Sequence, residues 1–261
     1  MTDSEAISEG WQGWDAYAAF YDWENAQTVR RRDVAFWQRL APAADGPVLE
    51  LGCGTGRISL PLAKSGVSLV GLDRSTPMLA RARQRLARAK ALDRTLLVRG
   101  DVRALPFRPR RFPLVIAPYG ILQSLVRERD LAAALDSIAA VLRKGGRVGI
   151  DLVPDLPRWS EYARKTTLSG RMGRNTTVTL VESVRQERAR KLTVFDQEYV
   201  THRRGVRRVH RFSLTFRTVS VPGMSRRLER AGFRVDAVLG DYRGGPWDAR
   251  ADVWIILASK R

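Results

Sequence analysis

The chain is poor in the residues that build metal centres and covalent cross-links. Its 261 residues contain one cysteine, Cys53, and two histidines. A single cysteine excludes an intrachain disulfide, and so few cysteines and histidines give no reason to expect a metal site. No apolar stretch approaches the roughly 18 residues of a membrane-spanning helix, and the first residues lack the basic and apolar segments of a signal peptide. We therefore expect a cytoplasmic protein without a membrane anchor.

Acidic residues are also scarce relative to basic ones. Lysine and arginine number 46 against 27 aspartates and glutamates, which gives a net charge of +19. Such a charge favours anionic partners, and residues 164–217 alone carry 14 basic and 4 acidic side chains. Forty of the bases are arginine, however, and the nucleotide composition of a genome can produce the same skew. A solvated arginine-rich surface and an anion-binding role therefore both stay open.

Hydrophobic periodicity shows how the chain is organised. Aromatic residues within 11–40 recur at spacings of three and four, which predicts a helix that docks on the core or also covers a ligand site. Residues 47–153 alternate short apolar strands with helices expected near 55–65, 75–91 and 127–142. This alternation predicts a doubly wound α/β domain built on a parallel sheet.

The segment 176–220 changes character. It is rich in β-branched and aromatic residues with period-two stretches, and we expect a three-stranded antiparallel sheet inserted after the fifth parallel strand. The chain then returns to α/β with a helix that ends at Gly232 and two final strands. The predicted domains are an N-terminal helical cap at 1–46, a core of 47–155 and 221–261, and a lid insert at 156–220.

The sharpest local signal is a glycine-rich turn between a strand and a helix, in VLELGCGTGRISL. Gly52, Gly54 and Gly56 allow a tight turn whose backbone approaches a ligand closely, beside the free N–H groups of a helix N-terminus. The dinucleotide fingerprint G-x-G-x-x-G would place its third glycine at position 57, where this chain has Arg57. The turn alone is therefore weak evidence for a nucleotide site.

Acidic residues at the ends of the next two strands strengthen the evidence for a nucleotide site. Asp73 ends the second strand, 19 residues after Gly54, where a carboxylate meets the ribose hydroxyls of a bound nucleoside. Asp101 ends the third strand. Each aspartate alone could be a helix N-cap. Because all three strand ends share the carboxyl edge of the sheet, together they predict one ligand crevice.

The sequence at these positions resembles the class I S-adenosylmethionine-dependent methyltransferases. ELGCGTGR resembles their first motif, GLDRSTPMLARAR their second, GDVRALPF their third and LRKGGRVGIDL their fifth-strand region, and VWIILASK resembles their last strand. The resemblance covers roughly 47–153 and 222–261. It implies a Rossmann-like seven-stranded sheet of order 3-2-1-4-5-7-6 with an antiparallel last strand. It also implies S-adenosylmethionine as cofactor and S-adenosylhomocysteine as product.

The same resemblance implies a set of cofactor-binding residues. The turn residues would pack on the methionine part, and Asp73 would bond the ribose. Met78, Asp101 and Val102 would contact the adenine, and Pro118 would lie near the sulfonium. The implied set is Gly52, Cys53, Gly54, Gly56, Asp73, Arg74, Met78, Asp101, Val102 and Pro118.

A looser resemblance concerns the leader WDAYAAFYDWEN, the insert and the loop GDYRGGPW. These look like the small-molecule N-methyltransferases that act on sarcosine-like amines or on nucleotide-linked aminosugars. In that group the insert forms a lid over the acceptor and a leader tyrosine closes over the cofactor, a part that Tyr17 or Tyr21 would take here. Some aminosugar enzymes carry a histidine after strand four, where this chain has Gln123 and Ser124.

Three functions follow as alternatives. The leading interpretation is methyl transfer to an amine or hydroxyl of a small-molecule acceptor, anionic if the basic insert binds it, with catalysis largely by proximity and orientation. The second is an RNA or protein methyltransferase that uses the basic insert, and the third is a fold member without activity. Nucleic-acid binding is not expected beyond a nonspecific level, because Phe212, Leu214 and Phe216 alternate as a buried strand face would.

A general base is needed only to expose a lone pair on a protonated amine or a hydroxyl. Candidate bases are Tyr119, after the fourth strand, and His202, in the insert. Weaker candidates are His210, Asp241 and Tyr242.

Overall fold

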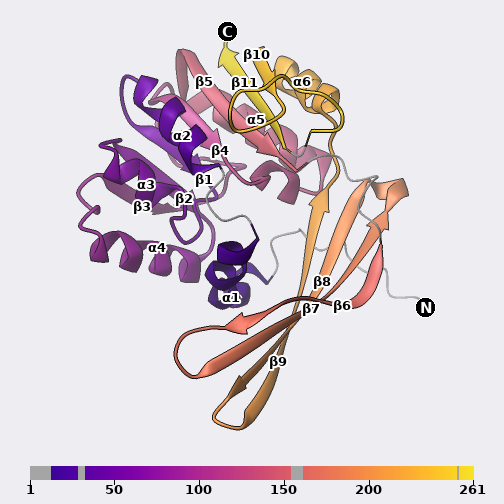
Figure 1. Cartoon of the computed structure of the whole chain (residues 1–261). Helices are drawn as coiled ribbons and strands as arrows, with labels where there is room; N and C mark the ends of the chain where they lie inside the picture. The colour runs from indigo at the N-terminus through magenta and orange to yellow at the C-terminus, as the bar shows by residue number, and fades with distance from the viewer. Residues whose placement is uncertain (1–12, 29–32, 154–160, 252) are drawn as a thin grey trace.

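Two sheets organise the molecule, a seven-stranded mixed sheet and a separate four-stranded antiparallel sheet (Figure 1). The computed structural model describes residues 13–28, 33–153, 161–251 and 253–261. Across the large sheet the strands are β10 (Phe233–Leu239), β11 (Trp254–Lys260), β5 (Leu142–Leu152), β4 (Phe112–Ala117), β1 (Val48–Leu51), β2 (Leu69–Asp73) and β3 (Thr95–Arg99). Only β11 runs antiparallel to its neighbours. The predicted fold class and strand order are confirmed.

Helices cover both faces of this sheet and bury its apolar side chains. They are α2 (Val34–Leu40), α3 (Ser59–Lys64), α4 (Thr76–Arg88), α5 (Glu128–Val141) and α6 (Val221–Arg230). A further helix, α1 (Trp14–Gln27), packs on α4 and on the antiparallel sheet instead. The short 3₁₀ turns are η1 (Ala41–Ala43), η2 (Ile121–Ser124) and η3 (Arg188–Arg190). Residues of α5 and α6 share one apolar cluster with the strands, whereas α2 and α3 share another. No helix among the described residues is long and apolar enough to cross a bilayer.

Two helix predictions differ from the structure. The aromatic leader forms two helices, α1 and α2, and part of the predicted span (11–12 and 29–32) lies outside the described residues. The helix expected from Thr55 starts at Ser59, because Gly54 and Gly56 adopt left-handed φ angles of 53° and 77° that a right-handed helix cannot contain. Gly232 ends α6 with a φ of 86°, as predicted.

The insert forms four strands rather than the three predicted. They are β6 (Tyr162–Arg171), β7 (Thr176–Glu187), β8 (Leu192–Arg203) and β9 (Val206–Arg217), paired in that order. The missed strand is β6, an edge strand that is mostly exposed. Edge strands need little apolar alternation, so its sequence YARKTTLSGR gives a weak signal. The predicted boundary between core and insert, at 155 and 156, lies outside the described residues.

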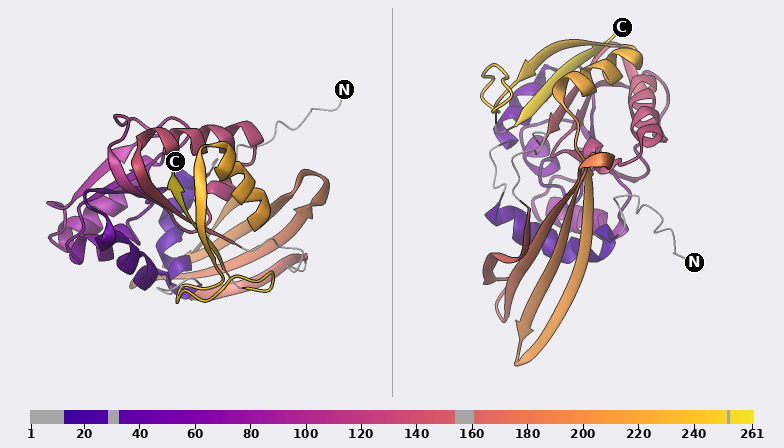
Figure 2. Two further views of the ribbon diagram at one scale, coloured as in Figure 1. Left: turned by 90° about the horizontal axis from the view of Figure 1, so that it is seen from above. Right: turned by 90° about the vertical axis from the view of Figure 1, so that its right-hand side faces the viewer.

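The antiparallel sheet, called the lid sheet below, extends away from the core at the carboxyl edge of the parallel strands (Figure 2). It follows the carboxyl end of β5, and its strand β9 contacts η2, which follows β4. Helix α1 lies between the lid sheet and the core (Figure 1). Tyr17 and Phe20 of α1 share a buried cluster with Leu180 and Tyr199 of the lid and Met78 of α4.

Candidate active site

The glycine-rich turn after β1 is built from three left-handed residues. Gly52, Gly54 and Gly56 have φ angles of 61°, 53° and 77°. A Cβ at Gly52 would lie 2.6 Å from the side chain of Ile121, so glycine is required there by space as well as by backbone conformation. The turn therefore follows a backbone path and fits into a space that glycine alone accommodates without strain.

Asp73 ties the end of β2 to this turn. One carboxylate oxygen accepts a hydrogen bond from the Gly54 N–H at 2.8 Å, and the other accepts from the Ser75 N–H at 2.8 Å. Burial raises the pKa of Asp73. A carboxylate has about four acceptor positions, so these two bonds leave capacity for the hydroxyls of a ligand.

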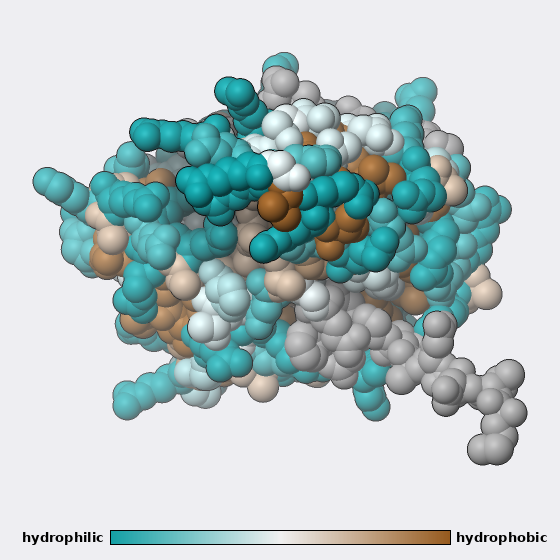
Figure 3. All heavy atoms as spheres, turned by 90° about the horizontal axis from the view of Figure 1, so that it is seen from below, coloured by the Kyte–Doolittle hydropathy of each residue, from teal (hydrophilic) through white to brown (hydrophobic). Residues whose placement is uncertain are grey.

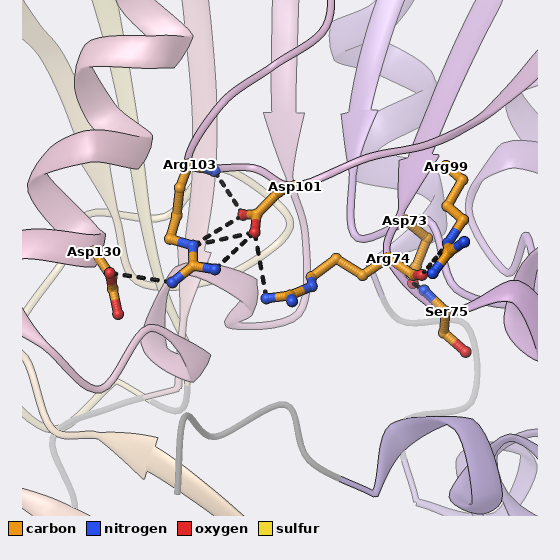
Figure 4. Close-up of polar contacts among 7 residues, drawn as sticks. All are labelled: Asp73, Arg74, Ser75, Arg99, Asp101, Arg103 and Asp130. Atoms are coloured by element: carbon orange, nitrogen blue, oxygen red, sulfur yellow. Dashed lines mark hydrogen bonds and ion pairs between the residues drawn. The ribbon is translucent and has the colours of Figure 1, made fainter. Parts of the chain in front are cut away.

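Asp101 lies beyond the end of β3 in a cluster of charges (Figure 4). Its carboxylate contacts Arg103 at 2.8 Å and Arg74 at 3.3 Å, and Arg103 also pairs with Asp130 at 3.2 Å. Burial raises the pKa of Asp101, but the bonds from Arg103 outweigh that effect and hold its pKa below the ordinary value. Asp101 is therefore ionised and already shared between two arginines.

The remaining residues of the implied cofactor set lie around the same strand ends. Cys53, Met78 and Val102 are 3%, 2% and 7% exposed, and Pro118 is buried directly after β4. Burial raises the pKa of the Cys53 thiol well above its usual range, so this cysteine is an apolar packing residue rather than a nucleophile.

Helix α1 packs directly on the glycine-rich turn. A Cβ at Gly54 would lie 3.8 Å from the ring of Tyr21, and the Thr55 hydroxyl donates to Asp22 at 2.6 Å. Asp22 also pairs with Arg85 of α4 at 2.8 Å. The leader is thus fixed over the strand ends.

Arg57, which stands in place of the third fingerprint glycine, has its own partner. Its guanidinium donates two hydrogen bonds of 2.7 Å to the fully buried carboxylate of Asp33. The same guanidinium lies 5.4 Å from the ring centroid of Tyr119. Sequence reasoning missed this pair, because the two residues are 24 positions apart and only the fold brings them together.

A cavity of about 400 Å³ opens between α1, the segment after β4 and the lid sheet. Its wall combines aromatic rings, carboxylates and small polar groups. The wall includes Trp14, Tyr17, Tyr21, Glu24, Tyr119, Gln123, Thr167, Glu182, Thr193, Phe195, Gln197, Phe216 and Arg217. The structure therefore brings Tyr17, Tyr21 and Tyr119 together at one cavity.

Two glutamates lie in hydrogen-bonded groups at this cavity. Both the Tyr17 hydroxyl, at 2.5 Å, and the Tyr199 hydroxyl donate to one oxygen of Glu24. Glu182 accepts from the Tyr162 hydroxyl and from the Gln197 amide, the latter at 2.9 Å. Burial raises the pKa of Glu24.

The sequence could have suggested one of these glutamates. Glu24 follows Tyr17 and Tyr21 at seven and three residues, on the same face of a helix. Glu182 and Gln197 are register partners on β7 and β8, and no spacing along the chain reveals a register.

The candidate bases separate clearly. Tyr119 lines the cavity and is 40% exposed. His202 is exposed, lies two residues before the β8–β9 turn and is not among the described residues that line the cavity. The sequence did not indicate how far this turn lies from the cavity.

The three weaker candidates also fall outside the cavity wall. His210 packs on Phe20, with ring centroids 5.0 Å apart. Asp241 accepts N–H bonds within its own exposed loop, and Tyr242 donates to buried Asp151 at 2.8 Å.

Known proteins are similar to this chain in both sequence and fold. A family profile described as a methyltransferase domain matches residues 48–146. The phosphatidylethanolamine N-methyltransferase of Cereibacter sphaeroides is 36% identical over 146 residues, which are 56% of this chain and 67% of that protein. The cypemycin N-terminal methyltransferase of a Streptomyces species is 28% identical over 231 residues, 87% of this chain and 89% of that protein.

A third relative matches over a shorter part. The demethylmenaquinone methyltransferase of Lactiplantibacillus plantarum is 39% identical over 109 residues, and the match spans 44% of its length and 41% of this chain.

Solved structures show the same fold at lower identity. The CcbJ methyltransferase of Streptomyces caelestis has a TM-score of 0.72 at 20% identity, covering 87% of this chain and 88% of that one. The sugar N-methyltransferase KedS8 of a Streptoalloteichus species has a TM-score of 0.74 at 18% identity, covering 92% of both chains.

The glycine-rich turn, the acidic strand ends and these similarities agree on one assignment. The turn and Asp73 lie at the carboxyl edge of the parallel strands, where α/β proteins bind nucleotides. The chain therefore belongs to the S-adenosylmethionine-dependent methyltransferases and uses S-adenosylmethionine as its cofactor.

Proposed function

We propose that this methyltransferase transfers the methyl group to an amine nitrogen of a small-molecule acceptor held in the cavity beneath the lid sheet. The observation that carries the proposal is the charge of the cavity wall, which contains the carboxylates of Glu24 and Glu182. Carboxylates in a cavity wall attract a cation and repel an anion, so a protonated amine suits the cavity. The names of two relatives, a phosphatidylethanolamine N-methyltransferase and the cypemycin N-terminal methyltransferase, also indicate amine acceptors.

Arg217, the one arginine among the described residues of the cavity wall, supports the same choice. The terminal nitrogens of Arg217 donate to Glu128 and to the Val126 carbonyl, the latter at 2.7 Å. Its charge is therefore already paired, whereas an anionic acceptor would need a guanidinium directed at it. We accordingly favour a cationic acceptor over the anionic one considered from the sequence.

Unpaired polar atoms in the wall suggest further features of the acceptor. The hydroxyls of Thr167 and Thr193 and the Nε of Arg217 are buried without a hydrogen-bond partner among the described residues. Buried polar groups are normally satisfied. An acceptor with hydroxyl or carbonyl groups beside its amine would supply the missing partners.

The cofactor site fits the glycine-rich turn and its neighbours. Gly52, Gly54 and Gly56 give a turn without side-chain bulk, Asp73 retains acceptor positions for ribose hydroxyls, and Met78 and Val102 provide apolar contacts. Tyr21 packs on the turn and would close over the bound cofactor, with Tyr17 behind it. When bound, S-adenosylmethionine supplies an electrophilic methyl group on a good leaving group.

The protein's part in this reaction is chiefly positioning. The rate of such a methyl transfer increases most when the protein holds the nucleophile at near-attack distance from the methyl group. Tyr21 packs on the glycine-rich turn and also lines the acceptor cavity. Tyr119, which follows β4, lines the same cavity. The aromatic wall that these rings form with Trp14 and Phe195 would exclude water and orient the acceptor.

A labelled-methyl screen tests the proposal. Purified protein with S-adenosylmethionine would be incubated with separate pools of amino sugars, peptides with free N-termini, ethanolamine lipids, hydroxyl compounds and RNA, and products would be detected by mass spectrometry. We expect methylation within one amine pool. Methylation confined to hydroxyls or RNA would contradict the proposal.

A further inference from the structure

Glu24 combines three features that the positioning account leaves without a role. Its carboxylate lines the acceptor cavity, two tyrosine hydroxyls donate to it from different elements, and it lies one helical turn beyond Tyr21, which packs on the glycine-rich turn. Simple structural support would not require a carboxylate at a cavity wall, because desolvating a charge is costly.

We propose that Glu24 is the general base of this enzyme, binding the protonated amine of the acceptor and removing its proton before methyl transfer. This inference rests on the proposed amine acceptor and adds the residue that makes the amine nucleophilic. An alkylammonium has no lone pair on nitrogen, so near neutral pH a proton must leave before attack.

The two tyrosine bonds orient Glu24 for this task. Tyr17 and Tyr199 both donate to Oε2, and Gln197 also hydrogen-bonds to this carboxylate, which still leaves a lone pair for a further donor. Tyr17 comes from α1 and Tyr199 from β8, and Phe20 stacks on Tyr199 with ring centroids 4.4 Å apart. The carboxylate is thus fixed at the contact between α1 and the lid sheet.

The position of Glu24 relative to the cofactor site also suits the role. Tyr21 and Glu24 are three residues apart on one helix face, about 4.5 Å along the helix axis. Tyr21 contacts the glycine-rich turn, whereas Glu24 contacts the lid. An amine bound to Glu24 would therefore lie in the acceptor cavity close to Tyr21, the residue that contacts the glycine-rich turn.

The proposed step balances as follows. An N–H bond of the ammonium breaks, its proton moves to Oε1 of Glu24, and the electron pair stays on nitrogen. That pair forms the N–C bond to the methyl group as the C–S bond breaks, and the electrons of that bond remain on sulfur in S-adenosylhomocysteine. The proton then leaves Glu24 for solvent.

The groups that face Glu24 determine how it titrates. They are Tyr17 and Tyr21 on α1, Tyr119 after β4, Glu182 on β7, and Gln197 and Tyr199 on β8. Burial raises its pKa, the tyrosine hydrogen bonds lower it, and the charge of Glu182 raises it again, with a net upward shift. Only the ionised form accepts a proton, so activity should fall as pH decreases through this raised pKa.

Glu24→Gln tests the proposal because the amide keeps the size and can accept the tyrosine bonds but cannot take a proton. With an amine substrate from the screen, we expect single-turnover rates at pH 7 to fall about 10²–10³-fold. The acidic limb of the wild-type pH profile should disappear, and the variant's rate should rise tenfold per pH unit as the amine loses its proton to solvent. Glu24→Asp should keep the acidic limb at a reduced rate.

A binding measurement gives a second readout that does not depend on turnover. Cyclohexylammonium and cyclohexanol have similar shapes but differ in charge, and their binding can be followed by NMR titration. We expect the wild type to prefer the cation about tenfold and Glu24→Gln to lose this preference. Glu229→Gln, an exposed glutamate on α6, is the matched control and should change neither rate nor preference.

The outcomes separate the two proposals. If the wild type methylates an amine but Glu24→Gln keeps its rate and pH profile, Glu24 is not the base although the amine assignment stands. If the wild type methylates no amine, both proposals fail. Melting curves and cofactor binding establish whether each variant is folded, and if Glu24→Gln is not, Glu24→Asp together with the wild-type cation preference decides the matter.

Discussion

At the residue scale, Asp73 illustrates how one side chain serves two purposes. The sequence suggested a ribose ligand, and the structure adds that the same carboxylate accepts N–H bonds from Gly54 and Ser75. Without it, the Gly54 N–H would lose its partner and the turn would lose its link to β2. Cofactor binding therefore depends on Asp73 both through the ligand and through the shape of the turn.

We accordingly expect Asp73→Ala to weaken S-adenosylmethionine binding by about 2–4 kcal/mol, roughly 30- to 1,000-fold in Kd. Isothermal titration calorimetry measures this directly. Asp136→Ala, at an exposed position on α5, serves as control and should bind like the wild type. Equal affinity in Asp73→Ala and the control would show that Asp73 is not a ligand.

At the element scale, α1 is held by contacts on two sides. Asp22 bonds to Thr55 of the turn and Arg85 of α4, whereas Phe20 stacks on Tyr199 of the lid sheet. A 14-residue helix has little stability by itself, so these tertiary contacts decide whether it stays docked. Because α1 carries the wall residues of the cavity, its docking and acceptor binding should be coupled.

Phe20→Ala should weaken the packing of α1 on the lid sheet. Phe20 is 3% exposed, and removing a buried aromatic ring typically costs about 3–5 kcal/mol. We expect faster amide hydrogen exchange in α1 and β8, measured by mass spectrometry, with unchanged exchange in β4. Phe20→Leu should give a smaller effect of the same kind. If the amides of α1 exchange no faster in Phe20→Ala than in the wild type, Phe20 does not hold α1 on the lid sheet.

At the scale of the whole molecule, the net charge is +19, and residues 164–217 of the lid carry 14 basic and 4 acidic side chains of that total. Several lid arginines pair with acids, as Arg164 and Arg211 do with Glu198. Four others, at 203, 204, 207 and 208, are exposed around the β8–β9 turn. Figure 3 shows hydrophilic side chains over much of the face seen from below, interrupted by hydrophobic patches.

This arrangement should not make a specific RNA site. The aromatic rings that could stack on bases, such as Phe195 and Phe216, line the cavity instead. We expect RNA binding no tighter than a nonspecific Kd of about 10⁻⁴–10⁻⁶ M at physiological salt, weakening with a log–log slope near −0.7 per phosphate contact. Fluorescence anisotropy across a salt series measures both values, and a nanomolar, sequence-dependent complex would refute the expectation.

The sequence by itself determined the α/β core and the position of its ligand edge. Alternating apolar strands and helices specify the sheet because each element must bury its apolar side, and Gly54 and Asp73 mark the edge through local backbone and strand-end chemistry. These signals are local, so a single chain reveals them. An exposed edge strand such as β6 carries no such signal and was missed.

Only the tertiary structure decided the acceptor cavity. Glu24 and Tyr199 are 175 residues apart, and Glu182 faces Gln197 through a strand register that no sequence spacing encodes. The same holds for the charge of the cavity, since the basic lid sequence suggested an anion whereas packing directs two glutamates inward and pairs Arg217 with Glu128. Long-range packing decides which side chains are in contact, and the proposed chemistry depends on those contacts.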